Sequence, residues 1–253
     1  MRSLPSLRSV LFAAVGVVAL AAPAVTAELS SEQRSQIEGV VRDYLVNNPQ
    51  VLKEAIAALE KHQEEEQRAT VADAVREITS GPVDGIVLGN PEGDVTLVEF
   101  FDYNCGYCKR ALGDIEALVK AEPRLRFVIV DFPILRQESV DAALVSIAAG
   151  RQLEGDKYFR FHSNLLLQSG VVGKEQALAA AKASGVDMAR LEKDIASSDV
   201  RQVLARTMQA GEKLGISGTP SFVAGDGVLP GAVGIDTLKQ VVASVRQCGK
   251  LDC

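Results

Sequence analysis

Two cysteines separated by two residues, Cys105-Gly106-Tyr107-Cys108, are the feature of this 253-residue chain best suited to chemistry. A thiolate rather than a thiol attacks a disulfide, so such a pair needs a site that lowers the pKa of one cysteine. The pattern places Cys105 after a strand and before a helix, where free backbone N–H groups and the helix dipole stabilise negative charge. Cys108 follows one helical turn later, close enough to resolve a mixed disulfide. The spacing therefore predicts thiol–disulfide exchange with Cys105 as nucleophile.

The two residues between the cysteines are candidates for contact with the substrate. Gly106 keeps the turn uncrowded, and Tyr107 helps to set how well the reduced thiolate is stabilised. An inert structural disulfide is the alternative. A disulfide across a two-residue spacer at a helix start is strained and labile, however, which favours exchange.

The chain has four cysteines, and the other two are Cys248 and Cys253. Four cysteines allow three disulfide pairings, of which the local one, 105–108 with 248–253, is the most economical. Half a zinc site is the alternative, but the spacing lacks a second short CxxC knuckle and the chain has two histidines. We expect a structural disulfide at the chain end, with no metal and no cofactor.

Glu99 is an acidic residue in an otherwise apolar strand, six residues before Cys105. A buried carboxylate there would have a raised pKa and could relay protons to or from Cys108. A strand-edge position facing water is the alternative. Lys109 and Arg110, which follow the pair, are expected mainly on the solvated surface. Electrostatic assistance to the thiolate is the alternative.

Thr219-Pro220 precedes a second pair of strands. A cis proline there would bring backbone beside the cysteines, and its peptide groups could bind an extended substrate by strand addition. An ordinary trans turn is the alternative.

The first residues are typical of a secretory leader. Two arginines come first, residues 10–20 are apolar, and Ala27 ends a short run of small residues, which predicts cleavage there. The apolar run is far shorter than the roughly 18 residues of a spanning helix. We expect residues 1–27 to be a signal peptide and the mature protein to lie outside the cytoplasm.

The charge excludes nucleic acid as a partner. The chain has 27 basic and 33 acidic side chains, and loss of two leader arginines would change the formal net charge from −6 to −8. Phosphate backbones require a basic surface instead.

Residues 28–80 are predicted to form a helical arm. Apolar residues recur at helical spacing on both sides of Asn48-Pro49, and the middle of the second helix, residues 60–68, is almost wholly polar. An appendage packed on its own domain is one interpretation. Self-association is the other, which we favour because an isolated apolar stripe needs a partner.

From Asn90 onward the pattern alternates strands and helices. Residues 95–101 and 125–131 read as strands around a helix, a βαβ unit that favours parallel pairing. A helical stretch over about 139–214 separates this unit from a hairpin and a last helix, 235–246. The order predicts an α/β domain over 81–253 with a helical insertion.

The segment from Val98 to Cys108, the helical insertion and Gly218-Thr219-Pro220-Ser221-Phe222 together resemble the DsbA family of bacterial periplasmic thiol–disulfide oxidoreductases. The resemblance implies a thioredoxin-like fold, Cys105 as nucleophile, Cys108 as resolving thiol and Pro220 in cis. Glu99 matches the family's buried acid.

The dipeptide and the arm depart from the simplest members. Gly-Tyr stands where strongly oxidising DsbA proteins have Pro-His, and it is similar to the dipeptide of the isomerase DsbC. The arm is similar to the N-terminal helices of the ScsC-type branch. That branch is associated with copper tolerance and forms oligomers through those helices. The resemblance implies a periplasmic disulfide isomerase acting on exported proteins with cysteines, kept reduced by a membrane protein of the DsbD type. A DsbA-like oxidase recharged by a DsbB-type protein is one alternative, and a copper-binding or chaperone protein is another.

Overall fold

The computed structural model describes residues 29–80 and 84–253. The expected signal peptide and its cleavage point after Ala27 lie outside these residues. The chain divides into two compact units, Met1–Ala58 and Leu59–Cys253, each described here by itself. Within the described segments, no helix combines the length and apolar character that crossing a membrane requires.

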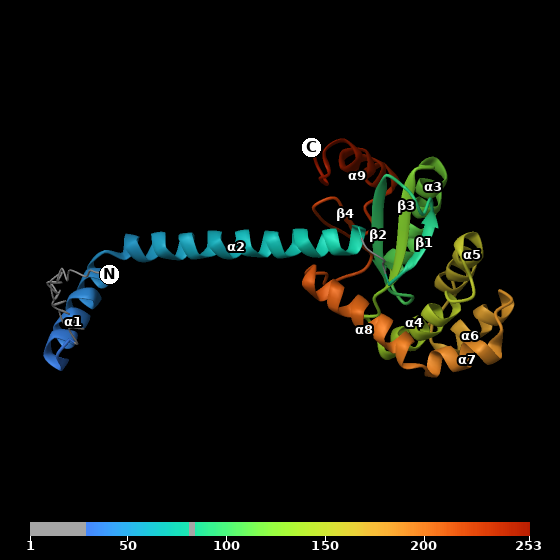
Figure 1. The fold of residues 1–253 in the computed structure, drawn as a ribbon, viewed down its shortest axis with the longest axis horizontal. Coiled ribbons are helices and arrows are strands. Elements are labelled where there is room, and N and C mark those ends of the chain that lie inside the picture. The colour runs from blue at the N-terminus through green and yellow to red at the C-terminus, as the bar shows by residue number, and fades with distance from the viewer. Residues whose placement is uncertain (1–28, 81–83) are drawn as a thin grey trace, which may run out of the picture. The chain divides into compact units, whose positions relative to one another are not determined.

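The described part of the first unit consists of helix α1, Ser31–Asn47, and the first turns of helix α2, Pro49–Ser80 (Figure 1). Ser30 caps α1 in a reciprocal box: the Gln33 N–H donates to Ser30 Oγ at 3.2 Å, and the Ser30 N–H donates to Gln33 Oε1 at 3.0 Å. The helix ends just before a proline, because the residue preceding proline disfavours helical geometry. All of α1 is described, and none of its residues is buried.

The last turns of α2 belong to the second unit. Ala74 and Val75 are buried against the sheet, and Val71 and Ile78 are half-buried beside them. The end of the segment predicted as an arm, 28–80, therefore contributes to the core of the second unit. A division between arm and catalytic domain at residue 80 stays a prediction.

The second unit is built on a five-stranded sheet in the order β1-β3-β2-β4-β5. Its strands are β1 Ile86–Gly89, β2 Val95–Phe101, β3 Leu125–Asp131, β4 Ser221–Ala224 and β5 Gly227–Pro230. Strands β2 and β3 run parallel and are joined by helix α3, Gly106–Ala121, whereas the other neighbouring strands are antiparallel. This sheet, with its helical insertion, confirms the thioredoxin-like fold.

Strand β1 was not predicted. Its four residues pair antiparallel with the outer edge of β3, with Leu88 opposite Phe127. A strand this short shows no full period of alternation, and it follows a Gly-Pro pair that indicates a break rather than a strand.

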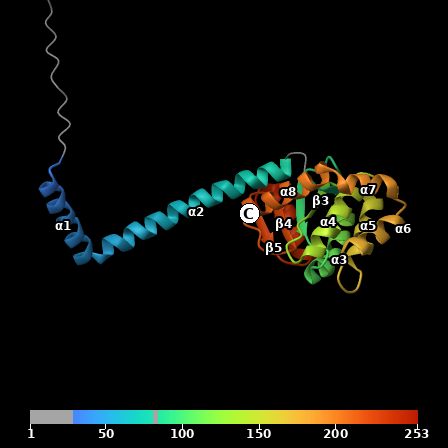
Figure 2. The same ribbon diagram turned by 90° about the horizontal axis from the view of Figure 1, so that it is seen from below.

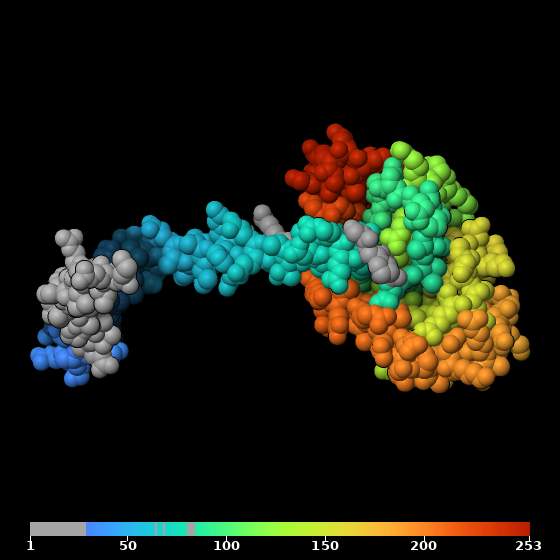
Figure 3. Space-filling view, viewed as in Figure 1, coloured from blue at the N-terminus to red at the C-terminus, as the bar shows by residue number. Residues whose placement is uncertain are grey.

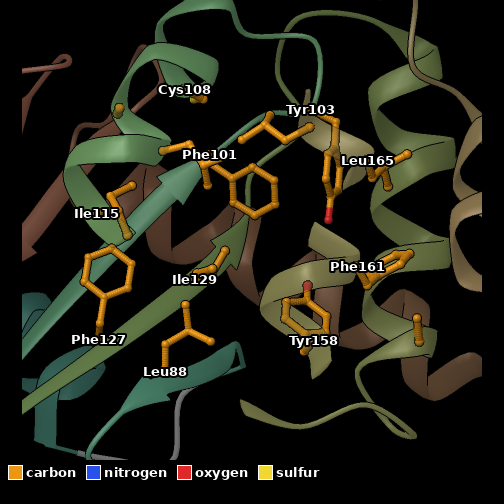
Figure 4. Close-up of a cluster of buried hydrophobic side chains, with 14 of the residues drawn as sticks. Leu88, Phe101, Tyr103, Cys108, Ile115, Phe127, Ile129, Tyr158, Phe161 and Leu165 are labelled. Carbon is orange, nitrogen blue, oxygen red and sulfur yellow. The ribbon is translucent and has the colours of Figure 1, made fainter. Parts of the chain in front are cut away.

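Side chains of the central strands alternate between two faces of the sheet. Leu97 and Phe101 lie on the face covered by α3, by α5, Gly155–Leu166, and by α9, Ile235–Cys248. Val98 lies on the opposite face, which packs against the last turns of α2 and against Leu214 and Ile216. Figure 4 shows Cys108 beside Phe101 in the first of these layers. The cysteine pair is therefore continuous with the main core.

Five helices form the insertion between β3 and β4. They are α4 Gln137–Ala149, α5 Gly155–Leu166, α6 Lys174–Ala183, α7 Met188–Ala196 and α8 Ser198–Lys213. Figure 2 shows them gathered beside the strands, and in Figure 3 the yellow and orange part of the insertion forms a continuous mass. The insertion thus packs as a layer against the thioredoxin-like core.

Candidate active site

The cysteine pair lies at the junction between β2 and α3. Cys105 is the N-cap of α3 in extended conformation, and its Sγ accepts from the Cys108 N–H at 3.5 Å. The Cys105 N–H donates to the Asp102 carbonyl at 2.9 Å. Both thiols are free, and Cys105 is 5% exposed while Cys108 is fully buried. One sulfur therefore borders the surface and the other lies behind it.

The two thiols have opposite electrostatic surroundings. A hydrogen bond from the Cys108 thiol, helped by the N–H groups of Cys108 and Tyr107, lowers the pKa of Cys105 from 9.0 to about 5, although burial opposes this shift. Burial raises the pKa of Cys108 far above its ordinary value, and its hydrogen bond to Cys105 and the Glu99 carboxylate raise it further. At neutral pH the arrangement therefore holds Cys105 as a thiolate and Cys108 as a thiol.

Glu99 is buried beneath the pair rather than facing water. It lies in the central strand β2, is 1% exposed, and shares a sheet face with Leu97 and Phe101. Burial, and then the charge of Cys105, raise the pKa of its carboxyl from 4.5 to about 8. A carboxyl with a pKa near neutrality can both accept and release a proton there.

Thr219 and Pro220 lie on the other side of Cys105. The Thr219–Pro220 peptide bond is cis, and Cys105 Sγ lies 3.0 Å from the Thr219 carbonyl oxygen, to which it donates when it is protonated. A hollow of about 480 Å³ opens here. It is lined by Tyr107, Leu214, Gly215, Ile216, Ser217, Gly218, Thr219, Pro220, Ser221, Val228, Pro230 and Gly231. Backbone and apolar side chains beside the nucleophile provide a place for an extended chain.

The residues around the tetrapeptide differ in their exposure. Gly106 faces open space, and the Tyr107 ring is 59% exposed beneath the Arg110 guanidinium, 4.0 Å from its centroid. Lys109 was expected on the solvated surface, but it is half-buried and its Nζ donates to the Gln168 carbonyl at 2.7 Å. The sequence does not reveal this contact because its acceptor is a backbone atom of the distant insertion.

A polar network holds the residues before Cys105, and it was not predicted. The Asp102 carboxylate accepts from the Asn104 N–H at 2.7 Å, the Ser139 hydroxyl at 2.7 Å and the Leu135 N–H at 3.0 Å. The available signal was the run Asp-Tyr-Asn, which puts polar side chains directly after a buried strand. The network joins the active-site loop to the start of the insertion.

Cys248 and Cys253 are joined by a disulfide after α9. Both cysteines are exposed, and the enclosed Leu251 packs against the core while its N–H donates to Asp226 Oδ1 at 3.0 Å. This geometry holds the described chain end against the β4–β5 turn.

Two family models match the chain. The model described as a DSBA-like thioredoxin domain matches residues 96–243, more than half of the chain. The model described as the copper resistance protein ScsC N-terminal domain matches residues 33–66.

Solved structures and curated proteins also match the chain. A thioredoxin-like oxidoreductase from Silicibacter pomeroyi DSS-3 is 41% identical, covering 67% of this chain and 95% of that one, with a TM-score of 0.62. Proteus mirabilis ScsC in a transitional conformation is 28% identical, covering 87% and 97%, with a TM-score of 0.62. The Na(+)/H(+) antiporter NhaA 1 of Salinispora arenicola is 26% identical over 160 residues, which are 62% of this chain and 24% of the antiporter. The chain thus spans about a quarter of the length of that curated relative.

Proposed function

The chain belongs to the DsbA-like thioredoxin-domain family, and from that premise we propose that it is a periplasmic disulfide isomerase that shuffles wrong disulfides in exported proteins. The main support for exchange chemistry is that the two cysteines differ: Cys105 is a thiolate at the border of the surface, and Cys108 is a buried thiol. A nucleophile with a lowered pKa and a resolving thiol one turn away are what such exchange requires.

Exchange begins with attack of the Cys105 thiolate on a client disulfide. A bond forms between Cys105 and one client sulfur, and the other client sulfur leaves as a thiolate. If that thiolate attacks a different client disulfide and the last client thiolate releases Cys105, the client is isomerised without net oxidation. If Cys108 attacks Cys105 Sγ instead, its proton passes to the ionised fraction of Glu99. The bond between Cys105 and the client sulfur breaks, the client sulfur leaves as a thiolate that takes a proton from solvent, and the pair becomes a disulfide.

Isomerisation requires a reduced pair, so a membrane thiol reductase of the DsbD type is the implied partner. The oxidising alternative is a DsbA-like oxidase recharged by a DsbB-type protein. The Gly106-Tyr107 dipeptide and the match of the N-terminal segment to the ScsC model support the isomerase.

The N-terminal segment supports self-association. Helix α1 exposes apolar side chains on one face, among them Ile37, Val40 and Tyr44, which are 48%, 69% and 56% exposed. Such a stripe is stable in water mainly when a second helix covers it. We expect several copies to join through α1, which would raise the effective concentration of reactive thiols around one client.

Light scattering tests the oligomer. Val40→Glu places a carboxylate on the apolar face and should lower the molar mass toward that of one chain. Ser35→Glu adds the same charge on the opposite face of α1 and should leave the mass unchanged. Equal masses for Val40→Glu and the unaltered protein would refute the role of this face.

Refolding of scrambled ribonuclease tests the isomerase. Reduced protein should restore ribonuclease activity, and Val40→Glu should restore less because its sites act singly. Failure of both, together with rapid oxidation of reduced ribonuclease, would identify a DsbA-like oxidase instead.

A copper-binding or chaperone role is the second candidate, favoured by the match to the copper resistance model at residues 33–66. Paired thiols suit Cu(I). Titration of Cu(I) into the protein and into Cys105→Ser discriminates, because undiminished binding by the variant would remove the cysteine pair from that role.

A further inference from the structure

The segment that leads from α8 into β4, residues 214–220, carries the Thr219–Pro220 peptide that lies beside Cys105. Two apolar side chains hold this segment on the domain. Leu214 and Ile216 are buried, whereas the glycine between them is exposed. Both also line the hollow of about 480 Å³ beside the nucleophile. The position of one wall of the hollow therefore depends on what these two side chains pack against.

The end of helix α2 belongs to the same apolar layer as these two side chains. The layer lies on the sheet face opposite α3, and Leu214 and Ile216 are members of it. Helix α2 contributes Val75, which is fully buried, Ala74, which is buried, and Ile78, which is half-buried. Strands β2, β3 and β4 supply most of the rest. The last turns of α2 and the 214–220 segment are therefore packed into one layer on one side of the sheet.

Helices α2 and α8 also meet at the point where the segment begins. Lys213 is the last residue of α8, and its Nζ lies 3.7 Å from Glu77 Oε2. A groove of about 230 Å³ between the two helices is lined by Ala74 and Ile78 from α2 and by Ala210 and Lys213 from α8. The ion pair is exposed and adds little to stability, but it places the end of α2 against the residue that precedes the segment.

We infer that the buried end of α2, through Val75, positions the 214–220 segment for the exchange reaction. Val75 supports Leu214 and Ile216 from behind, and this support holds the segment in place beside Cys105. The inference rests on the proposed exchange function and gives the N-terminal segment a second role in it. The exposed face of α1 serves assembly, whereas the end of α2 serves the site of its own chain.

The physical reason is the close packing of the layer. When a buried side chain is shortened, its neighbours relax partly into the space that it leaves. An extended client chain can bind main-chain groups of the 214–220 segment, whereas a small disulfide needs only the Cys105 sulfur. A shift of the segment should therefore slow a peptide more than a small disulfide.

The test compares two substrates of the reduced, full-length protein. One is a peptide whose single cysteine is joined by a disulfide to 2-hydroxyethanethiol, and the other is bis(2-hydroxyethyl) disulfide. In each reaction the Cys105 thiolate bonds to one sulfur, the substrate disulfide breaks, and 2-hydroxyethanethiolate leaves and takes a proton from solvent. The measured quantity is the ratio of the second-order rate constant for the peptide to that for the small disulfide.

Val75→Ala should lower this ratio by about three- to tenfold, the factor expected when one main-chain hydrogen bond to the client is lost. Val75→Ile, which keeps the layer filled with a branched apolar side chain, should restore the ratio. Val200→Ala is the matched control, because Val200 is also fully buried but lies in the main core at the first turn of α8. This control should lower the free energy of unfolding to a similar extent and keep the ratio.

Val40→Glu separates the positioning role from assembly. It should lower the molar mass and keep the ratio, whereas Val75→Ala should keep the molar mass and lower the ratio. The same fall of the ratio in Val40→Glu would trace the effect to assembly and would overturn the inference.

A partial loss of folded protein slows both substrates together and leaves the ratio unchanged, so the ratio distinguishes positioning from stability. If Val75→Ala does not fold, Ile78→Ala takes its place, with Ile195→Ala, half-buried in the main core, as its control. An unaltered ratio in Val75→Ala, or an equal fall in Val200→Ala, would overturn the inference while leaving exchange intact. No reaction of the unaltered protein with the small disulfide would instead overturn the proposed function.

Discussion

Replacing the buried Glu99 with glutamine should stabilise the reduced protein at neutral pH. Burial raises the pKa of this carboxyl to about 8, against 4.5 for an ordinary glutamate. Folding at pH 7 therefore requires the carboxyl to take up a proton that the unfolded chain does not hold. Over 2.5 pH units, at about 1.36 kcal/mol per unit, this requirement lowers the free energy of unfolding by about 3 kcal/mol.

The sign of the pH dependence follows from the raised pKa. The full stability is present below pH 4.5, where folded and unfolded states both hold the proton, and it is lost progressively as the pH rises toward 8. Glutamine does not titrate. The variant should thus be about 3 kcal/mol more stable than the unaltered protein at pH 7 and nearly equal to it at pH 4.

Urea unfolding of the reduced protein at pH 4 and pH 7 measures this difference. Glu192→Gln, on the exposed face of α7, is the matched control and should show little difference at either pH. If the Glu99→Gln difference is the same at both pH values, or if the variant is less stable at pH 7, the pKa of Glu99 is not raised in the folded state, and its carboxylate is too weak a base to take the proton of Cys108.

Three further predictions concern the chemistry and its support. Cys105→Ser should abolish exchange and Cys108→Ser should accumulate mixed disulfides with clients, as seen on non-reducing gels; turnover by the first variant would exclude the mechanism. Asp102→Ala should lower the free energy of unfolding by about 2–4 kcal/mol in a urea titration, because three hydrogen bonds lose their acceptor, and an unchanged midpoint would contradict the network. Cys253→Ser should lower the free energy of unfolding by about 2 kcal/mol, because it opens a short covalent loop, and should leave the rate of exchange unchanged. Loss of exchange in this variant would contradict a purely structural role of the disulfide.

Features with strong local patterns were predictable from sequence. The strands before and after α3 are continuous apolar runs, and the two-residue cysteine spacing predicts the N-cap position of Cys105 without any tertiary information. The parallel pairing of β2 and β3 follows from the single helix that joins them. These elements, together with the insertion, define the thioredoxin-like core.

Features that depend on distant partners were not predictable. Whether Glu99 faces the core depends on which strand is central, and the sheet places β2 between β3 and β4. The contacts of Asn104 with Val172 and of Lys109 with Gln168 end on backbone atoms more than fifty residues away, so no side-chain pattern marks them. Ala74 and Val75 are likewise buried because the sheet covers them, and the polar middle of the same helix, α2, gives no sign of this.

The central claim is that the strand–helix junction makes Cys105 a thiolate at neutral pH. Titration of the ultraviolet absorbance of the thiolate in the reduced protein tests it most directly, with Cys105→Ser as the reference. The structure predicts a transition with a pKa of about 5 that is absent from the variant. A transition near 9, the ordinary value for a thiol, or one that persists in Cys105→Ser, would contradict the assignment of Cys105 as the nucleophile.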